Sequence, residues 1–358
     1  MAPAVLECAR RDDVLRSTVC VTGQHREMLA GVMDYFGITP DVDLGVMAAG
    51  QGLADLAARC LQGLEGVIEQ YRPDCVVAQG DTTSVLAAAL AAFYARVPFI
   101  HVEAGLRTGN LEAPWPEELN RRMVSIATAV HCAPTRRAAE TLAAEGVSPA
   151  RIHVTGNTVI DALLWTVDRE RRSGAAWPLR YAYLSDRPLV LVTGHRRENF
   201  GPGLAGLCRA LGRLADRFPG VEFVYPVHLN PNVRGPVYEA LSGRNNVHLV
   251  QPVPYPEFVW LMDRSTLILT DSGGIQEEAP SLGKPVLVMR QSTERPEALE
   301  SCAVELVGTD AETIESRVSL LLNNPSEVQR RRVDVNPFGD GRAAQRIVQL
   351  IVDRAWTA

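Results

Sequence analysis

The chain has 358 residues, of which 46% are hydrophobic and 22% charged, as is typical of a globular protein. The net charge of −6 argues against a nucleic-acid-binding surface, and no apolar run approaches the roughly 18 residues that cross a membrane. Seven cysteines without CxxC spacing indicate neither a disulfide framework nor a zinc site, and the first residues lack the pattern of a signal peptide. We therefore expect a cytoplasmic protein with no metal, nucleic-acid or membrane partner.

Short apolar runs alternate with helical patterns along the chain. Strands are expected at residues 18–22, 75–79, 98–102, 129–132, 152–155, 188–193, 222–227, 247–250, 267–270, 286–289 and 303–307. Helices are expected between most of them, such as 83–95, 157–166, 203–218 and 342–356. This alternation predicts an α/β fold whose parallel sheets are covered by helices on both faces.

The length predicts two domains of roughly 150–200 residues each. Residues 169–187 form the least patterned stretch, with charges, a proline and a Gly-Ala-Ala, so we place the domain junction there. We expect doubly wound, Rossmann-like domains at 1–168 and 169–340, and a C-terminal helix at 341–358 that packs back on the first domain. Two such domains facing each other would place their strand ends across a cleft, where ligands prefer to bind.

Three carboxylates lie at strand ends or a helix start in the first half of the chain. Asp81 follows the strand at 75–79 and opens a helix, where an aspartate alone is more typical of an N-cap. Glu103 follows the next strand, and Glu117 comes directly after Pro116 at the start of another helix. Carboxylates crowded on one rim rarely favour stability and are useful for proton transfer. This clustering predicts acid/base chemistry.

An anion site is predicted after the strand at 267–270. Ser272, Gly273 and Gly274 follow that strand and precede a helical pattern, so free backbone N–H groups and a helix dipole face a ligand there. A lone Ser-Gly-Gly is more typical of a simple helix cap. The polar cluster around Arg295, after the adjacent strand, favours a phosphate instead, because open α/β sheets bind ligands at such strand ends. Glu278, one turn into the helix, suits a ribose.

Other polar residues follow strands in the second half. His195 and Arg196 come after the strand at 188–193, and His228 comes after the following strand. These positions suit a phosphate or sugar contact, although a lone histidine is more often structural. Phe258 and Trp260 could place a ring near a nucleobase, but core packing is the more common use of aromatic residues at this spacing.

These motifs together resemble the non-hydrolysing UDP-N-acetylglucosamine 2-epimerases. The matching segments are Gln79–Thr83, His101–Gly109, Pro114–Glu118, Thr155–Asp161, Thr193–Asn199, Pro226–Asn232 and Asp271–Glu278. The resemblance runs from about Met1 to the C-terminal helix. It implies the two-Rossmann glycosyltransferase-B architecture, a homodimer, and interconversion of UDP-GlcNAc and UDP-ManNAc without a cofactor, for envelope or capsular polysaccharide.

The resemblance also implies roles for particular residues. Members of the family eliminate UDP while a proton leaves C2, and then re-add UDP after protonation of the opposite face. The acid/base and sugar-side residues implied are Asp81, Glu103, Glu117 and His195. The UDP-binding residues implied are Ser272, Gly273, Gly274, Glu278, Arg295 and Phe258. Some bacterial members bind a second UDP-GlcNAc, and the residues in matching motifs are Gln24, His25, Arg196 and His228.

The chain departs from the family at its start. Members of the family carry a first strand and a Gly-Thr-Arg-Pro-Glu loop before the segment that matches Met1-Ala-Pro, and this sequence begins after them. A first strand in the middle of a doubly wound sheet has neighbours on both sides. We therefore expect codons upstream of Met1 to encode this strand and loop, and the longer form to be the more soluble and active one.

Three other functions share some of these sequence features. A 2-epimerase of a related UDP-diacetamido-uronic acid would carry the same motifs, because they report on the UDP half of the substrate. A glycosyltransferase of the same architecture needs fewer carboxylates than the first domain carries. A nucleotide-sugar-binding protein with impaired catalysis is suggested by the missing strand.

Overall fold

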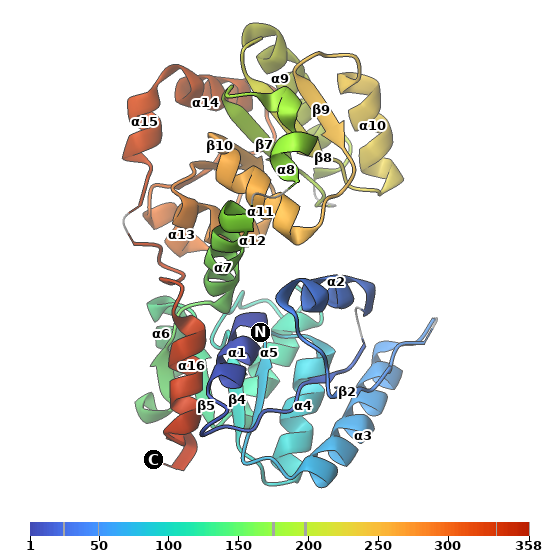
Figure 1. The fold of residues 1–358 in the computed structure, drawn as a ribbon, viewed down its shortest axis with the longest axis vertical. Helices are drawn as coiled ribbons and strands as arrows, with labels where there is room; N and C mark the ends of the chain where they lie inside the picture. The colour runs from blue at the N-terminus through green and yellow to red at the C-terminus, as the bar shows by residue number, and fades with distance from the viewer. Residues whose placement is uncertain (24–25, 49, 174–175, 197–198, 334, 358) are drawn as a thin grey trace. The chain divides into compact units, whose positions relative to one another are not determined.

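The computed structural model describes residues 1–23, 26–48, 50–173, 176–196, 199–333 and 335–357. The chain forms two compact units of helices and parallel strands (Figure 1). The first contains Met1–Ala162 and Phe338–Ala358, and the second Leu163–Pro337. The sequence places the junction at 169–187, whereas the chain passes between units within α7 (Thr158–Ser173), a helix that continues through position 169. In the described ranges, no helix is long and apolar enough to cross a membrane.

The first unit is built on a parallel sheet with the order β3-β4-β5-β6. Its strands are β3 (Val76–Gln79), β4 (Phe99–Val102), β5 (Val130–Ala133) and β6 (Ile152–Val154). Side chains alternate between the two faces of a strand. Phe99 accordingly packs with α3 (Leu53–Tyr71) and α4 (Thr83–Tyr94), while Ile100 and Val102 pack with Ile347 of α16 (Ala343–Val352). The C-terminal helix α16 also contacts α1 (Ala2–Arg10).

Two short strands form a separate sheet in the first unit. β1 (Cys20–Val21) pairs in parallel with β2 (Val42–Asp43), and neither joins the four-stranded sheet. Between them lies α2 (Arg26–Phe36). This unit also contains α5 (Glu117–Ala127), α6 (Arg136–Ala144) and short 3-10 turns at Pro149–Arg151 and Ala355–Thr357.

The second unit contains a six-stranded parallel sheet with the order β12-β11-β10-β7-β8-β9. Its strands are β7 (Leu189–Thr193), β8 (Glu222–Pro226), β9 (Val247–Val250), β10 (Leu267–Thr270), β11 (Val286–Val288) and β12 (Val304–Leu306). One face packs against α9 (Pro202–Arg217) and α14 (Ala311–Asn323) in a large apolar core. Further helices are α8 (Trp177–Arg180), α10 (Pro231–Leu241), α11 (Tyr255–Arg264), α12 (Gly273–Glu278), α13 (Pro296–Glu300) and α15 (Pro325–Arg330). The predicted parallel α/β class is confirmed.

The sheet topology positions the polar residues that the sequence singled out. Asp81 and Glu103 follow the neighbouring strands β3 and β4. His195 and Asp271 follow β7 and β10, which also pair in parallel. Because parallel neighbours end at the same edge of a sheet, each pair is brought together by strand order alone.

Candidate functional site

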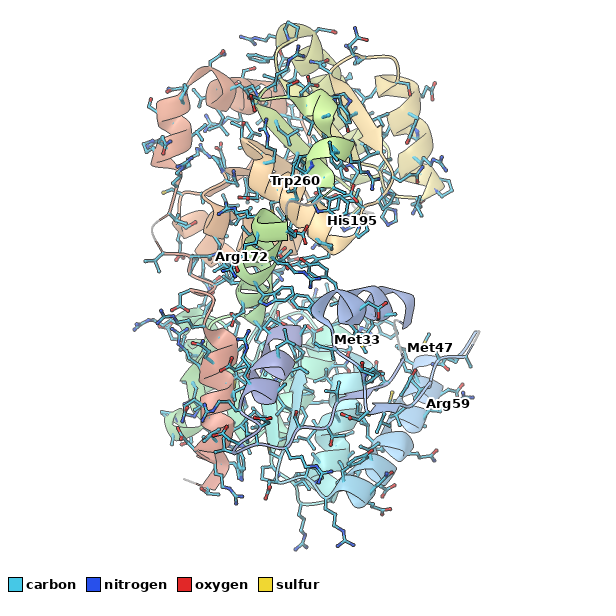
Figure 2. The ribbon with its side chains drawn as sticks, viewed as in Figure 1. Met33, Met47, Arg59, Arg172, His195 and Trp260 are labelled. Atoms are coloured by element: carbon cyan, nitrogen blue, oxygen red, sulfur yellow. The ribbon has the colours of Figure 1, made fainter. Side chains whose placement is uncertain are left out.

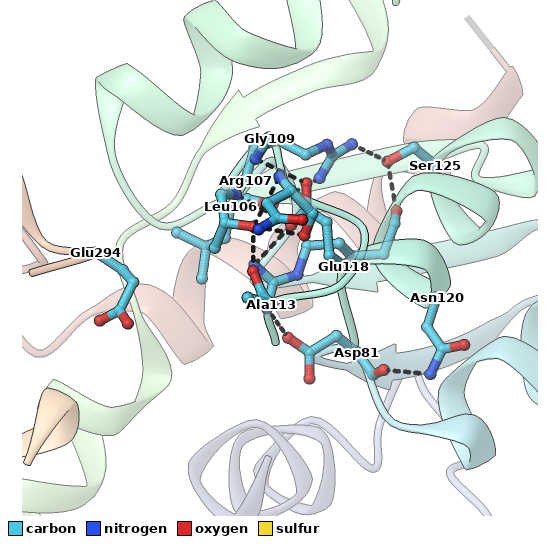
Figure 3. Close-up of polar contacts among 12 residues, drawn as sticks. Asp81, Leu106, Arg107, Gly109, Ala113, Glu118, Asn120, Ser125 and Glu294 are labelled. Atoms are coloured by element: carbon cyan, nitrogen blue, oxygen red, sulfur yellow. Dashed lines mark hydrogen bonds and ion pairs between the residues drawn. The ribbon is translucent and has the colours of Figure 1, made fainter. Parts of the chain in front are cut away.

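Asp81 sits in a turn that other side chains of the first unit hold in place (Figure 3). The Asn120 amide donates to the Asp81 backbone carbonyl at 2.9 Å, and the Arg121 guanidinium forms an ion pair with the Asp81 carboxylate. The buried His101 ring bonds the neighbouring carbonyl of Gly80 at 2.8 Å. Burial lowers the pKa of His101 to about 4, so this imidazole is neutral near pH 7 and its Nε2–H donates. The turn therefore presents Asp81 in a defined orientation.

Asn120 and Arg121 lie on α5, one turn after Glu117. Residues three and four apart share a helix face, so Glu117, Asn120 and Arg121 all point to one side. Asn120 and Arg121 bond to Asp81, which places Glu117 on the helix face nearest that carboxylate. The sequence analysis gave Glu117 a role and gave none to Asn120 and Arg121. The helical spacing behind Pro116 was the signal that could have found them.

Glu118, the next residue, occupies a different environment from Glu117. Its side chain is fully buried, whereas Glu117 is half-buried. Its two carboxylate oxygens accept the backbone N–H groups of Thr108 at 3.0 Å and Gly109 at 3.2 Å. It also lies 3.3 Å from the Arg121 guanidinium. Glu118 therefore connects the 108–109 loop to the arginine that pairs with Asp81 (Figure 3).

Glu103 has an unusual backbone conformation for a side chain with a Cβ. Its φ is +67°, in the left-handed region that non-glycine residues rarely adopt. Its carboxylate accepts from the Gln79 amide at 3.3 Å and from the Asn157 amide at 3.4 Å. Strained residues of this kind occur where the surrounding structure needs a side chain in one direction. Here that direction brings a carboxylate beside Gly80, one residue before Asp81.

A pocket of about 310 Å³ lies on the second unit, and many of its lining residues were predicted from the sequence. The predicted residues that line it are His195, His228, Phe258, Ser272 and Glu278. They come from the ends of β7, β8 and β10 and from α11 and α12. The strand order of the sheet thus gathers predicted residues as far apart as His195 and Glu278 into one pocket.

The Ser-Gly-Gly turn adjoins an arginine. Ser272 precedes α12, and a methyl group added at Gly273 would come within 3.2 Å of the Arg295 guanidinium. Glycine at this position therefore leaves room for Arg295 to lie against the turn. Arg295 is also held by Glu277, whose carboxylate accepts its Nε–H at 2.8 Å. Backbone N–H groups, a hydroxyl and a guanidinium together suit an anion.

Two imidazole rings face each other in this pocket. The rings of His195 and His228 are stacked with centroids 5.9 Å apart and planes 20° apart. His195 comes directly after Gly194, whose carbonyl accepts the Tyr225 hydroxyl at 3.2 Å. The buried carboxylate of Asp271 lies 3.3 Å from His195 Nδ1. The sequence named both histidines and gave Asp271 no role.

Glu278 is buried at the end of α12, where the Tyr255 hydroxyl donates to it at 3.4 Å. Burial, and next the charge of Glu277, raise the pKa of Glu278 to about 8. The carboxyl group is therefore held largely protonated near neutral pH in the ligand-free protein. A ribose hydroxyl that donates to the carboxylate would favour its ionised form.

Replacing Glu278 by glutamine should flatten the dependence of stability on pH. The folded pKa of about 8 exceeds the ordinary value of 4.5, so the contribution is fully present below pH 4.5 and lost as pH rises toward 8. Glu278→Gln should therefore gain stability relative to the parent protein between pH 5 and about 8.5. Urea unfolding at several pH values measures this. Glu239→Gln, an exposed carboxylate on α10, is the control, and parallel curves for Glu278→Gln and parent would contradict the expectation.

The two aromatic residues of α11 have different surroundings. Phe258 lines the pocket, as a base-stacking residue would. Trp260, labelled in Figure 2, instead stacks on Tyr181 with ring centroids 5.5 Å apart. The Tyr181 hydroxyl donates to the buried Glu257 at 2.6 Å, which anchors this stack inside the second unit. Core packing, the common use of such residues, therefore describes Trp260.

Three further residues, Gln24, His25 and Arg196, were predicted from the sequence. Gln24 and His25 lie outside the described residues. Arg196 lies 3.9 Å from Glu294 and lines a small pocket of about 10 Å³ with His195 and Asp271. In the part of the chain that the structure describes, no group of three or more His, Cys, Asp or Glu side chains could hold a metal ion.

Comparison with known proteins accounts for this arrangement. The family model for UDP-N-acetylglucosamine 2-epimerase matches residues 7–352. The chain belongs to the UDP-N-acetylglucosamine 2-epimerase family. A member named UDP-N-acetylglucosamine 2-epimerase from Yersinia pestis is 51% identical over 355 residues, covering 98% of this chain and 94% of that member. The corresponding protein of Escherichia coli K12 is 50% identical with the same coverage.

Solved structures of the epimerase family have the same fold. The UDP-GlcNAc 2-epimerase from Neisseria meningitidis bound to UDP-GlcNAc matches with a TM-score of 0.90 and 44% identity, over 99% of this chain and 96% of that one. The 2-epimerase structure from Listeria monocytogenes matches with a TM-score of 0.93 and 41% identity, over 100% and 93% of the two chains. Family and glycosyltransferase-B-like fold, both expected from the sequence motifs, are confirmed.

Proposed function

We propose that this protein interconverts UDP-N-acetylglucosamine and UDP-N-acetylmannosamine by inverting the configuration at C2. The observation that carries the proposal is the family match across residues 7–352. The carboxylates that follow β3 and β4 and the pocket of the second unit support it, because the reaction needs both proton transfer and a held diphosphate. The matched family and its relatives are named for UDP-N-acetylglucosamine epimerisation, which favours this reaction over a uronic-acid substrate and over a binding-only role.

The proposed reaction proceeds by elimination and re-addition. A carboxylate takes the proton from C2 while the C1–O bond breaks, so that UDP leaves and a glycal forms. A proton is then returned to the opposite face of C2, and UDP adds back at C1. Two faces of one carbon need acid/base groups in different places, and we assign these roles to Asp81, Glu103 and Glu117.

Residues of the second unit are proposed to hold the nucleotide. Ser272, Gly273 and Gly274 would donate to the diphosphate, with Arg295 neutralising charge as UDP departs. Glu278 would accept ribose hydroxyls, and Phe258 would stack on uracil. The supporting observations are the pocket that Ser272, Glu278 and Phe258 share and the proximity of the Arg295 guanidinium to Gly273.

A second UDP-GlcNAc is proposed to bind near the first, at Gln24, His25, Arg196 and His228. Two of these residues, Arg196 and His228, are described by the structure and support the proposal. Arg196 lies close enough to the Ser-Gly-Gly turn for its guanidinium to come within 3.6 Å of a methyl group added at Gly273. The exposed ring of His228 is stacked on His195.

Incubation with UDP-GlcNAc in deuterated water, followed by proton NMR, tests the proposed function. We expect deuterium at C2 of both sugars, UDP-ManNAc as the new species, and no net consumption of UDP-sugar. Binding of UDP-GlcNAc without exchange would contradict catalysis. Exchange only with a UDP-diacetamido-uronic acid would contradict the assigned sugar and keep the mechanism.

We also propose that the protein is a homodimer that pairs through α5. Leu119, Met123 and Ile126 recur at helical spacing on this helix and are 44%, 41% and 85% exposed. A stripe of large apolar side chains left in water favours a partner surface. A two-fold contact buries the same patch on both copies, so one stripe supplies both halves of an interface.

Ile126→Glu should convert the dimer to monomers, because a charge placed in an apolar contact is left without a partner. Light scattering after gel filtration at micromolar concentration measures the mass. Leu179→Glu is the matched control, since Leu179 is 84% exposed on α8 of the other unit. A monomeric parent protein, or an Ile126→Glu variant that stays dimeric, would exclude this surface.

A further inference from the structure

Asp271 joins two loops at the edge of the second sheet. It follows β10 and its side chain is fully buried. Its Oδ2 accepts the backbone N–H groups of His195 and Arg196, both at 2.9 Å, and the Asn199 amide at 3.2 Å. The loop after β7 is therefore attached by three donors to the residue that directly precedes Ser272.

The other oxygen of this carboxylate faces His195. Asp271 Oδ1 is buried without a hydrogen-bond partner in the described chain and lies 3.3 Å from His195 Nδ1. Buried carboxylate oxygens rarely lack a donor, and catalytic hydrogen bonds are often slightly long before a ligand binds. A carboxylate can only accept, so His195 Nδ1 must carry the hydrogen. Nε2 then holds the lone pair.

The neighbouring imidazole is held in the opposite tautomer. His228 Nδ1 accepts the backbone N–H of Asn230 at 3.1 Å. A neutral ring whose Nδ1 accepts must carry its hydrogen on Nε2. The two stacked rings of the pocket therefore differ: Nε2 of His195 offers a lone pair and Nε2 of His228 offers a donor.

We infer that Asp271 is a positioning residue for His195. It keeps the hydrogen on Nδ1, so that protons enter and leave this ring at Nε2. When Nε2 is protonated, the carboxylate stabilises the resulting imidazolium, as the aspartate of a hydrolase triad does. His195 and Ser272 line the same pocket, so the cation would favour the negative charge that develops on the departing diphosphate. The part of this inference that concerns turnover rests on the proposed function.

The tautomers can be measured without any variant. In the full-length protein labelled with 15N-histidine, long-range 1H–15N correlation spectra distinguish Nδ1–H from Nε2–H rings. His195→Gln and His228→Gln assign the two signals among the seven histidines. We expect an Nδ1–H ring for His195 and an Nε2–H ring for His228. An Nε2–H ring at His195 overturns the inference whether or not the protein proves to be an epimerase.

Asp271→Asn tests the consequence for turnover. An amide can donate to the ring, so His195 should lose its Nδ1–H preference while His228 keeps its tautomer. We expect kcat for UDP-GlcNAc epimerisation to fall at least about 10-fold with a smaller change in KM. Tyr225→Phe is the control, because it removes a different bond to the same loop, at Gly194, and should preserve the His195 tautomer.

A double variant separates positioning from general damage to the loop. In a His195→Gln background, Asp271→Asn should lower kcat no further, because the group it orients is gone. Multiplied losses in the double variant would overturn the positioning role. If no variant and no parent protein epimerises, the proposed function fails, while the tautomer measurement still decides the contact between Asp271 and His195.

Discussion

Asp81→Asn, Glu103→Gln and Glu117→Gln should each lower epimerase turnover by about 10²-fold or more, the range of general acid/base catalysis. Each substitution keeps the shape of the side chain and removes its ability to take up a proton. The Asn120 and Gln79 amides and the Arg121 guanidinium, which contact these residues, can also donate to an amide oxygen, so the fold should survive the change. Initial rates with UDP-GlcNAc, together with circular dichroism, measure both quantities.

Glu112→Gln provides a matched control for these variants, because Glu112 is an exposed carboxylate on the loop that leads to Glu117. Its turnover should stay within about twofold of the parent, as is usual for exposed positions without a special role. Near-parental turnover in any of the three carboxylate variants would remove that residue from the acid/base set. Deuterium exchange without epimerisation would show that only one face of C2 had lost its catalyst.

Glu118→Ala should lower the free energy of unfolding of the first unit by about 3–5 kcal/mol, the usual cost of removing one partner of a buried ion pair. The substitution leaves the N–H groups of Thr108 and Gly109 without their acceptor and Arg121 without a second carboxylate. Urea unfolding measures the loss. Hydrogen exchange at the Thr108 and Gly109 amides should accelerate in the same variant.

Glu117→Ala is the natural comparison, one residue away on the same helix. Glu117 is half-buried at the start of α5, so its loss should cost about 1 kcal/mol or less while turnover collapses. Glu118→Ala should therefore mainly lower stability, whereas Glu117→Ala should mainly lower turnover. A Glu118→Ala variant as stable as the parent would show that the 108–109 loop is held by other contacts.

The parallel sheets could be predicted from the sequence because their strands are buried on both faces. Such strands read as short continuous apolar runs, and Leu267–Thr270 was placed at its observed bounds. β2 (Val42–Asp43) was missed because a strand of two residues is too short to show an alternation of apolar and polar side chains. The boundary within α7 was missed because the helix continues while the chain passes from one core to the other.

The site could be predicted where a residue follows a strand, since strand order alone brings such residues together. His195, His228 and Ser272 line one pocket for that reason. Asp271 looked like part of the turn in the sequence, and its carboxylate could be understood only once β7 was seen beside β10. Spacing alone could not distinguish Glu117 from Glu118. The two side chains differ in burial, and burial depends on tertiary packing.

Helix α5 has two opposed faces, one carrying Glu117 and Arg121 and the other Met123 and Ile126. In the proposed homodimer, the Glu117 carboxylate and the subunit contact lie on the same three-turn helix. Specific activity would then fall on dilution, because a second copy holds α5 in place only while the two copies are bound. Assays at nanomolar protein would therefore give a lower specific activity than assays at concentrations where the copies are paired.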